Sequence, residues 1–394
     1  MNFTSIDHTI NENFSVVWDL GRRCTYSCSY CGPHHSNKTS PLVNIDDLKH
    51  TIDGVVEYSN LLNQYRKFSK KTTIAYTGGE PTIHPDFFPF VLYTKEKYPE
   101  LSSNITTNGC FNENKCLRII KCINSTTISY HTEASDKEKK LVKNNIEIMN
   151  DFKYPFRINL MFHKDHFEEC IEMSNWFDKM GIRYTPRPIG DSNNEQDILD
   201  GSAHVYNEEQ LSWFSNYWKR GKKIKSEIKK EKPKEKMAVT SIGRPCCNGK
   251  CMKIKIDEQV TQQTFVPSTN FQGWNCMVNW DFLFINSELD KVWHHQTCQI
   301  NLNVEMGSIG KASEFNMINK KLKNILQKGK FPIIKCPKTH CGCGLCSPKA
   351  LHKSDFLNIF ESKIKNIEPV FQENIIPLNK DNSIVRIMKR LDAK

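Results

Sequence analysis

Asp19-Leu-Gly-Arg-Arg-Cys24-Thr-Tyr-Ser-Cys28-Ser-Tyr-Cys31 places three cysteines within eight residues, with the spacing Cys-x3-Cys-x2-Cys. The stretch follows the apolar run Phe14-Ser-Val-Val-Trp-Asp-Leu20, which predicts a buried strand. Three thiolates on one short loop can hold three irons of a cubane [4Fe–4S] cluster, which leaves the fourth iron open to a substrate or cofactor. A protein that only carries electrons normally supplies a fourth cysteine, so the loop predicts cluster chemistry on a bound ligand.

Strand-like and helix-like segments alternate over the first half of the chain. The hydrophobic pattern predicts helices over 45–66, 85–97, 113–122, 136–150 and 166–179. It predicts strands over 14–20, 72–77, 104–107, 126–131, 157–162 and 183–187. Such alternation is typical of parallel βα units, so we expect an α/β fold with a partial (β/α)6 TIM-like barrel over 14–206.

Polar motifs follow these expected strands at their carboxyl ends, where barrels of βα units carry their chemistry. They are Cys24–Cys31, Gly78–Glu80, Asn108, His131–Glu133 and Arg187. Because parallel strands end at one edge of the sheet, the motifs predict a single pocket. His131 and Arg187 face this pocket by position, either as structural hydrogen-bond partners or as substrate contacts; both roles are open.

Gly78-Gly79-Glu80-Pro81 directly follows the second barrel strand. Two glycines let the backbone approach a ligand closely, and a carboxylate can accept hydrogen bonds from an ammonium group. Taken alone, the motif is equally typical of an ordinary tight turn. Its place one βα unit after the cysteine loop favours a binding role.

The cysteine loop, with Tyr30 before its last cysteine, and the Gly-Gly-Glu-Pro turn together resemble the radical S-adenosylmethionine (SAM) superfamily over about residues 14–190. The resemblance implies that a [4Fe–4S] cluster binds to Cys24, Cys28 and Cys31 and that SAM chelates its open iron. It implies reductive cleavage of SAM to a 5′-deoxyadenosyl radical, which takes a hydrogen atom from the substrate. The electron would come from an external flavodoxin-like or ferredoxin-like donor.

The resemblance also implies which residues contact SAM. Tyr30 would pack near the adenine, and the turn would bind the amino group of the methionine moiety. Thr107, Asn108 and Glu133 occupy strand ends where relatives contact the ribose or the carboxylate. The expected cofactor-binding residues are therefore Tyr30, Gly78, Gly79, Glu80, Asn108 and Glu133.

A second cysteine-rich region covers 241–350, where short cysteine spacings are typical of Fe–S clusters or of structural zinc. Cys276 and Cys298 bracket Trp280–Ile285 and Lys291–Trp293, which predict a β-hairpin. The order resembles the SPASM or twitch extensions of radical SAM enzymes and implies at least one auxiliary [4Fe–4S] cluster. Its expected ligands are Cys276, Cys298, Cys336, Cys341, Cys343 and Cys346, whereas Cys246, Cys247 and Cys251 either complete a site or cross the substrate channel.

The remaining segments complete the expected organisation. Residues 1–13 form a polar, loose lead-in without room for a fused peptide-recognition domain. Residues 207–240 hold a helix, with Asn207 as its cap and Leu211, Phe214 and Trp218 on its buried side, and then a basic linker. Residues 241–350 form the smaller cysteine-rich domain, and 351–394 form a helical tail.

The net charge of +11 comes mostly from one run, since residues 219–236 hold ten basic and three acidic residues. A solvated linker explains this run better than a nucleic-acid surface does, so nucleic acid is a partner that we do not favour. No apolar run approaches the roughly 18–20 residues that span a bilayer, and the first residues lack a signal-peptide pattern. We therefore expect a cytoplasmic protein without a membrane partner.

The substrate is the least determined feature. The resemblance favours a peptide or protein substrate, with a nucleotide, RNA or small molecule as the alternative. A non-enzymatic Fe–S electron carrier or scaffold is the hypothesis from another class, and it predicts that SAM does not bind.

Overall fold

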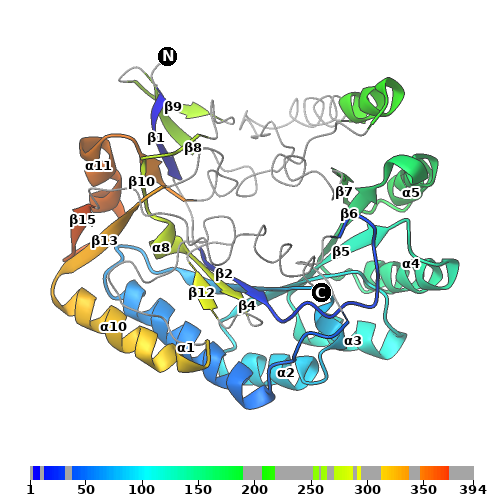
Figure 1. Ribbon diagram of the computed structural model, residues 1–394, viewed down its shortest axis with the longest axis horizontal. Coiled ribbons are helices and arrows are strands. Elements are labelled where there is room, and N and C mark those ends of the chain that lie inside the picture. Colours follow the sequence, from blue (N-terminus) through cyan, green and yellow to red (C-terminus); the bar gives the residue numbers. More distant parts are fainter. Residues whose placement is uncertain are drawn as a thin grey trace, which may run out of the picture.

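The computed structural model describes residues 3–8, 13–31, 38–189, 206–217, 252–256, 259–263, 270–286, 291–293, 312–336 and 347–371. Two sheets organise these residues (Figure 1). The larger has the order β12-β11-β2-β3-β4-β5-β6-β7, and the smaller has the order β15-β13-β10-β14-β1-β8-β9.

The larger sheet carries the expected βα units. Its strands are β2 (Asn13–Asp19), β3 (Lys71–Thr77), β4 (Ser102–Thr107), β5 (Ser125–His131), β6 (Phe156–Phe162) and β7 (Tyr184–Pro188). The helices between them are α1 (Ile45–Asn63), α2 (Phe87–Lys97), α3 (Glu113–Cys122), α4 (Asp136–Asp151) and α5 (Phe167–Lys179). Neighbouring strands pair in parallel from β2 to β7. Among the described strands, β12 and β7 are the two edge strands of this sheet and do not pair with each other, so the barrel is open. The prediction of a partial TIM-like barrel is confirmed.

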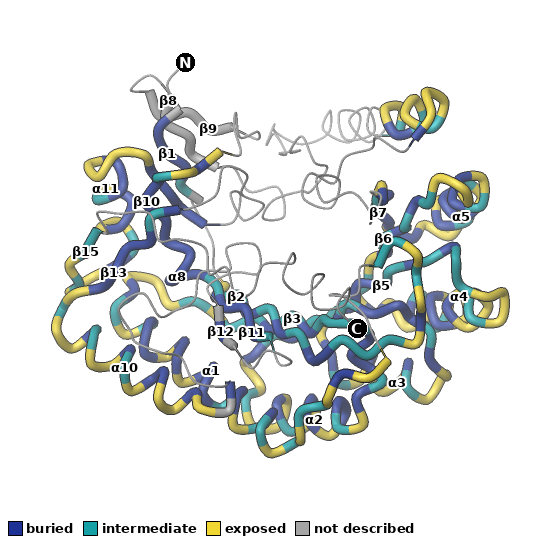
Figure 2. Tube along the Cα trace, viewed as in Figure 1, coloured by how far each residue is buried: buried dark blue, intermediate teal, exposed yellow. Residues whose placement is uncertain are grey.

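Alternate strand residues build the core between the sheet and its helices. On β2, Phe14, Val16 and Trp18 are buried against the helices, and Trp18 meets the ring of Phe90 edge-on at 5.2 Å between centroids. The intervening residues of the strand are partly accessible and face the other side. Figure 2 shows the result, with buried residues along the sheet and exposed residues on the outer sides of the helices.

The expected hairpin is confirmed, and it belongs to the barrel sheet. It consists of β11 (Phe282–Asn286) and β12 (Lys291–Trp293), and β11 pairs in parallel with β2. Leu283 and Ile285 are buried beside Val16 and Trp18 of β2, so β11 adds one more strand to the apolar face that packs on the helices. Trp280 lies in the short helix α8 (Val278–Asp281) and not in the hairpin itself.

The second sheet begins with residues that the sequence pattern suggests are loose. Phe3–His8 form β1, which pairs with β14 (Lys349–Ala350) on one side and β8 (Met252–Ile256) on the other. The expectation of a loose lead-in is therefore wrong, because backbone pairing and the complete burial of Ile6 hold this polar segment in place. The remaining strands of this sheet are β9 (Gln259–Gln263), β10 (Asn275–Cys276), β13 (Lys330–Lys335) and β15 (Glu368–Phe371).

The helices outside the barrel match the expectations in part. The expected tail helix is present as α11 (Lys353–Lys363), but it is followed by β15. Asn207 caps the helix that follows it, since its Oδ1 accepts a hydrogen bond from the Gln210 N–H at 2.9 Å. Phe214 is buried as expected, whereas Leu211 is 41% exposed because the neighbouring Trp213 packs against Phe162 in its place. Trp218 lies outside the described residues.

Helix α10 (Phe315–Gln327) attaches the second region to the barrel by packing along α1 (Figure 1). The Asn319 side chain donates a hydrogen bond to the Gly54 carbonyl oxygen at 2.9 Å. Phe315 lies directly over Gly54, so a Cβ at position 54 would stand 2.3 Å from the Phe315 Cβ. The helices can approach this closely only because residue 54 has no side chain.

None of the described helices is long and apolar enough to cross a membrane.

The contact between α1 and α10 predicts that Gly54→Ala destabilises this protein, although the same change stabilises an isolated helix. In an isolated helix this change stabilises by about 1 kcal/mol, but here it forces Phe315 away and should lower the free energy of unfolding by about 1–3 kcal/mol. Urea unfolding measures the difference, and Asn60→Ala on the exposed side of α1 is the control. A Gly54→Ala variant more stable than the wild type would contradict the packing.

Candidate active site

The cysteine loop leaves the end of β2 and lies against the turn that follows β3. The Gly79 N–H donates to the Gly21 carbonyl oxygen at 2.8 Å, and the Glu80 N–H donates to the Arg23 carbonyl oxygen at 2.8 Å. Gly78 has a φ of +134°, and a Cβ there would stand 2.4 Å from the Gly21 oxygen. The glycines therefore allow two backbone segments to meet, which fixes where the loop starts.

Glu80 is almost completely enclosed in the site, with 2% exposure. Its carboxylate accepts hydrogen bonds from the Asn108 N–H at 2.7 Å and from the Thr107 hydroxyl at 2.8 Å. It also accepts from the N–H of Thr82 at 3.1 Å and from its hydroxyl at 2.7 Å. Burial raises the pKa of Glu80, and these donors oppose the rise. The carboxylate thus joins the end of β3 to the end of β4; its expected contact with SAM stays a prediction.

Asn108 extends this connection to the cysteine loop. Its Nδ2 donates to the Thr25 hydroxyl at 2.9 Å and lies 3.9 Å from the Cys24 sulfur. Its Oδ1 accepts from the Cys110 N–H at 2.9 Å, which fixes the amide orientation. The strand end therefore orients the first cysteine through a single buried side chain.

The three cysteines of the loop are half-buried and influence one another electrostatically. Burial, followed by the nearby charges of Cys31, Glu133 and Cys24, raises the pKa of the Cys28 thiol to about 12. Burial likewise raises the pKa of Cys24, and Glu80 and Cys31 add to the effect. A cationic iron centre removes this penalty, because it binds thiolates in preference to thiols.

The donor set fits a cubane cluster better than a single metal ion. Within the part of the chain that the structure describes, no three His, Cys, Asp or Glu side chains converge on one ion position. A cubane does not need such convergence, since each cysteine binds an iron of its own.

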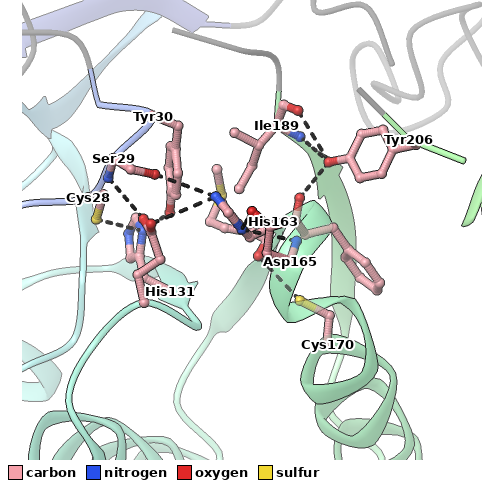
Figure 3. Close-up of polar contacts among 12 residues, drawn as sticks. Cys28, Ser29, Tyr30, His131, His163, Asp165, Cys170, Ile189 and Tyr206 are labelled. Atoms are coloured by element: carbon pink, nitrogen blue, oxygen red, sulfur yellow. Dashed lines mark hydrogen bonds and ion pairs between the residues drawn. The ribbon is translucent and has the colours of Figure 1, made fainter. Parts of the chain in front are cut away.

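His131 lies beneath the cysteine loop at the end of β5 (Figure 3). Its Nδ1 is 3.4 Å from the Cys28 sulfur and forms a hydrogen bond with the Tyr30 hydroxyl. The ring stacks on Tyr30 at 5.9 Å between centroids. Burial lowers the pKa of His131 to about 4, so the imidazole is neutral at physiological pH. These contacts give His131 a structural role at the second cysteine.

Glu133, after the end of β5, and His163, after the end of β6, hold the middle of the loop. Figure 3 shows His163 directed at Ser29. The Glu133 carboxylate accepts a hydrogen bond from the Ser29 N–H at 3.0 Å. The His163 Nε2 lies 3.4 Å from the Ser29 hydroxyl and 3.7 Å from Glu133. Sequence reasoning identified Glu133 but missed His163, although His163 directly follows the last residue of a strand.

Asp19 is a second residue that sequence reasoning missed, although it stands in the opening stretch. It ends β2, accepts a hydrogen bond from the Gly21 N–H at 2.9 Å, and would meet a Cβ on Gly78 at 2.7 Å. Burial raises the pKa of its carboxyl group to about 6. The site therefore contains a carboxylate beside the glycine turn that, unlike Glu80, belongs to the partly accessible face of the sheet.

The structure brings together all the residues expected around the first cluster: Cys24, Cys28, Cys31, Tyr30, Gly78, Gly79, Glu80, Asn108 and Glu133. Arg187 lies on β7, where its Nε donates to the Asn159 Oδ1 at 3.2 Å. The Tyr206 hydroxyl closes this side by bonding the backbone of Phe162 on β6 and Ile189 after β7 (Figure 3).

Two of the expected auxiliary ligands lie at the second sheet, Cys276 on β10 and Cys336 directly after β13. Cys276 and Cys336 are buried on adjoining chain segments, where Cys276 pairs with Ile334 and the Cys336 N–H donates to the Trp274 carbonyl oxygen at 2.7 Å. This register makes the two cysteines diagonal neighbours on one face. The other expected ligands, and the cysteines whose role was left open, lie outside the described residues: Cys298, Cys341, Cys343, Cys346, Cys246, Cys247 and Cys251.

Residues 18–200 match the model of the Radical SAM superfamily. An "S-adenosylmethionine-dependent nucleotide dehydratase" from Selenomonas ruminantium is 30% identical over 96 residues, which is 24% of this chain and 30% of that protein. The matched segment is thus less than a third of that relative's length.

Solved structures with a similar arrangement include SuiB from Streptococcus suis, with 15% identity, a TM-score of 0.46, and coverage of 79% of this chain and 65% of SuiB. Native anSMEcpe with bound AdoMet and Cp18Cys peptide has 12% identity and a TM-score of 0.45, with coverage of 97% of this chain and 99% of that one.

The bonding of Glu80 predicts that Glu80→Gln destabilises the protein strongly. An amide presents an NH2 group to partners that are themselves donors, so at least one buried N–H or hydroxyl loses its acceptor. We expect the free energy of unfolding to fall by about 2–3 kcal/mol in urea titrations. Glu113→Gln on the exposed first turn of α3 should change it by less than about 0.5 kcal/mol. Equal effects of the two substitutions would argue against the network.

The lowered pKa of His131 predicts a pH dependence of stability. As the pH falls from about 6.5 towards 4, the unfolded chain takes up a proton that the folded protein refuses. Stability that is present above pH 6.5 is therefore lost on acidification, by up to about 3 kcal/mol. Urea unfolding of cluster-free, reduced protein tests this by comparison with His131→Gln, which should lose less stability in that window. Because Asp19 titrates in the same range, the difference between the two proteins is the informative quantity.

Proposed function

We propose that this chain, which belongs to the radical SAM superfamily through its domain at residues 18–200, binds a [4Fe–4S] cluster on Cys24, Cys28 and Cys31 and cleaves SAM reductively. One observation carries the proposal: four strand ends hold a loop with three mutually interacting thiols, and the loop sequence itself, residues 24–31, contains no fourth cysteine. An iron without a protein ligand is what SAM chelation requires. A carrier or scaffold has no use for that arrangement.

The cofactors, when bound, supply one-electron cleavage of the SAM sulfonium and hydrogen abstraction from the substrate by the resulting 5′-deoxyadenosyl radical. The chain's own residues determine where this happens. Glu80 holds the glycine turn rigid, so that the turn's backbone can meet the amino group of SAM. Asn108 orients the segment around Cys24, and neutral His131 contributes a hydrogen-bond partner beside Cys28 without adding charge.

The backbone around Ser29 is fixed by Glu133, which leaves Tyr30 stacked on His131 next to the last cysteine. We propose that this aromatic pair forms the wall against which the adenine packs. An external flavodoxin-like or ferredoxin-like protein would supply the electron.

We also propose an auxiliary [4Fe–4S] cluster in the second sheet. Cys276 and Cys336 support it, because two buried thiols that are diagonal neighbours on one sheet face can bind two irons of one cluster. Further ligands would come from Cys298, Cys341, Cys343 and Cys346. A structural zinc ion at the same cysteines is the alternative.

Two substrate classes have support. The SPASM-like order of cysteines around the hairpin favours a peptide or protein substrate. The similarity to a relative from Selenomonas ruminantium that is named as a nucleotide dehydratase favours a nucleotide. The reaction class is common to both, so it can be tested before the substrate is known.

Anaerobic reconstitution with iron, sulfide, dithionite and SAM should yield 5′-deoxyadenosine. Cys28→Ala should abolish the product, because a cubane held by two cysteines loses the site for SAM, and Cys122→Ala, outside both cysteine groups, should retain it. Failure of the wild type to form 5′-deoxyadenosine would reject the enzyme hypothesis.

Iron analysis of the same samples addresses the auxiliary cluster. About eight irons per chain are expected for two clusters and about four for one, and Cys276→Ala should lower the count while SAM binding persists. Stoichiometric zinc in place of the extra iron would establish the structural-metal alternative.

A further inference from the structure

Two ring side chains reach the sulfur of Cys28, the second cysteine of the loop. The His131 Nδ1 lies 3.4 Å from this sulfur, and the same nitrogen forms a hydrogen bond with the Tyr30 hydroxyl (Figure 3). Burial raises the pKa of the Cys28 thiol to about 12, and a hydrogen bond from the Tyr30 hydroxyl opposes this rise. The sulfur, the hydroxyl oxygen and the imidazole nitrogen therefore form one connected group.

The hydrogens of this group can be placed once Cys28 is a thiolate, which is the form that binds iron. A thiolate has no hydrogen and only accepts, and Tyr30 has a single hydrogen to donate. If the His131 Nδ1 carried no hydrogen, it would take the one from Tyr30, and the sulfur would face two lone pairs without a donor. The Nδ1 therefore carries a hydrogen, and donation runs from His131 to Tyr30 and on to Cys28.

Packing fixes both rings in this arrangement. His131 stacks on Tyr30 with 5.9 Å between the centroids and 11° between the planes. The buried Tyr26 meets the same imidazole edge-on at 5.5 Å. The Ser29 N–H donates to the Glu133 carboxylate at 3.0 Å, which fixes the backbone directly before Tyr30. The two donors are thus already oriented before an electron arrives.

We propose that His131 and the Tyr30 hydroxyl form a hydrogen-bond relay onto Cys28 that raises the reduction potential of the [4Fe–4S] cluster and so favours its one-electron reduction. Hydrogen bonds to the cysteine sulfurs are among the factors that set the potentials of Fe–S clusters. A donor stabilises the reduced cluster more than the oxidised cluster, because the added electron increases the negative charge on the sulfurs. His131 is then a positioning residue for electron uptake, since it acts through Tyr30 and Cys28.

This inference rests on the proposed function only for the presence of a cluster on Cys28. The relay does not depend on SAM, because donors to a thiolate act equally on a cluster that only carries electrons. It is also compatible with the proposed adenine wall. The hydroxyl lies in the plane of the Tyr30 ring, whereas an adenine would pack on a face of that ring, so one residue can serve both purposes.

The test is an anaerobic redox titration of the reconstituted full-length protein, followed by the electron paramagnetic resonance of the reduced cluster. Addition of SAM to parallel samples identifies the signal of the cluster on the loop. Tyr30→Phe keeps the ring and removes the hydroxyl, and His131→Phe keeps a stacked ring and removes the N–H. At the potential where the wild-type cluster is half reduced, we expect the ratio of reduced to oxidised cluster to fall by about threefold or more in both variants.

Two further variants separate donation from packing. His131→Asn supplies an amide N–H close to the position of Nδ1, so its ratio should return towards that of the wild type. Tyr93→Phe is the matched control, because it also removes a hydroxyl hydrogen bond, the one to Asp53 at 3.0 Å on the outer helices, and should leave the ratio unchanged. Iron analysis establishes that each variant holds its cluster.

An unchanged ratio in Tyr30→Phe or in His131→Phe would overturn the relay. So would an equal fall in Tyr93→Phe, or a fall in His131→Asn as large as that in His131→Phe, since the cause would then be lost packing. If one of the two phenylalanine variants fails to hold the cluster, the other decides. Failure of both would assign these side chains to assembly of the loop and contradict the proposal.

The two proposals fail separately. Formation of 5′-deoxyadenosine by the wild type, with a potential that the variants leave unchanged, would refute the relay and leave the reaction class intact. A lowered potential in the variants, without any 5′-deoxyadenosine from the wild type, would refute the radical chemistry and leave the relay. A protein that binds no cluster on Cys28 would refute both.

Discussion

The buried carboxylate of Glu80 is the interaction on which the site depends. It accepts hydrogen bonds from two consecutive residues of the β4 end, Thr107 and Asn108, while its own backbone N–H donates to the cysteine loop at Arg23. Three chain segments therefore meet at one residue. A carboxylate suits this position because it has no hydrogen to offer and can accept from several donors at once, whereas an amide or a hydroxyl would oppose one of them. The adjacent glycines complete the arrangement by letting the turn touch the loop.

The barrel and the cysteine-rich region are joined because each contributes a strand to the other's sheet. The N-terminal strand β1 lies in the smaller sheet and the next strand, β2, lies in the barrel, while β11 returns from the second region to extend the barrel beside β2. The packing of α10 on α1 adds a third connection. Because β2 ends at the cysteine loop, the second region is attached to the strand that carries the site.

Sequence reasoning predicted the barrel well and the second sheet poorly, for identifiable reasons. Runs such as Thr72–Thr77 and Arg157–Phe162 have the apolar periodicity that burial against helices requires, so their strands could be placed to within about two residues. β1 lacks that periodicity, since its two large apolar residues, Phe3 and Ile6, are three positions apart and so do not alternate along a strand. Its strand conformation depends on partners more than 240 residues away. The parallel pairing of β11 with β2 is likewise a long-range contact without a local signal.

At the site, the sequence motifs located Glu80 and Asn108, but the direction of their hydrogen bonds, which the sequence does not show, decides their roles. His163 was missed because it belongs to no motif, although it directly follows the last residue of β6.

Electron paramagnetic resonance of the dithionite-reduced protein, recorded before and after addition of SAM, tests the central claim most directly. A cluster held by Cys24, Cys28 and Cys31 has one iron without a protein ligand, so chelation by SAM must alter the signal of the reduced [4Fe–4S] cluster. The predicted result is a [4Fe–4S] signal whose g values shift with SAM in the wild type and in Cys276→Ala and that does not respond in Cys28→Ala. A reduced-cluster signal that SAM leaves unchanged in the wild type would contradict the account.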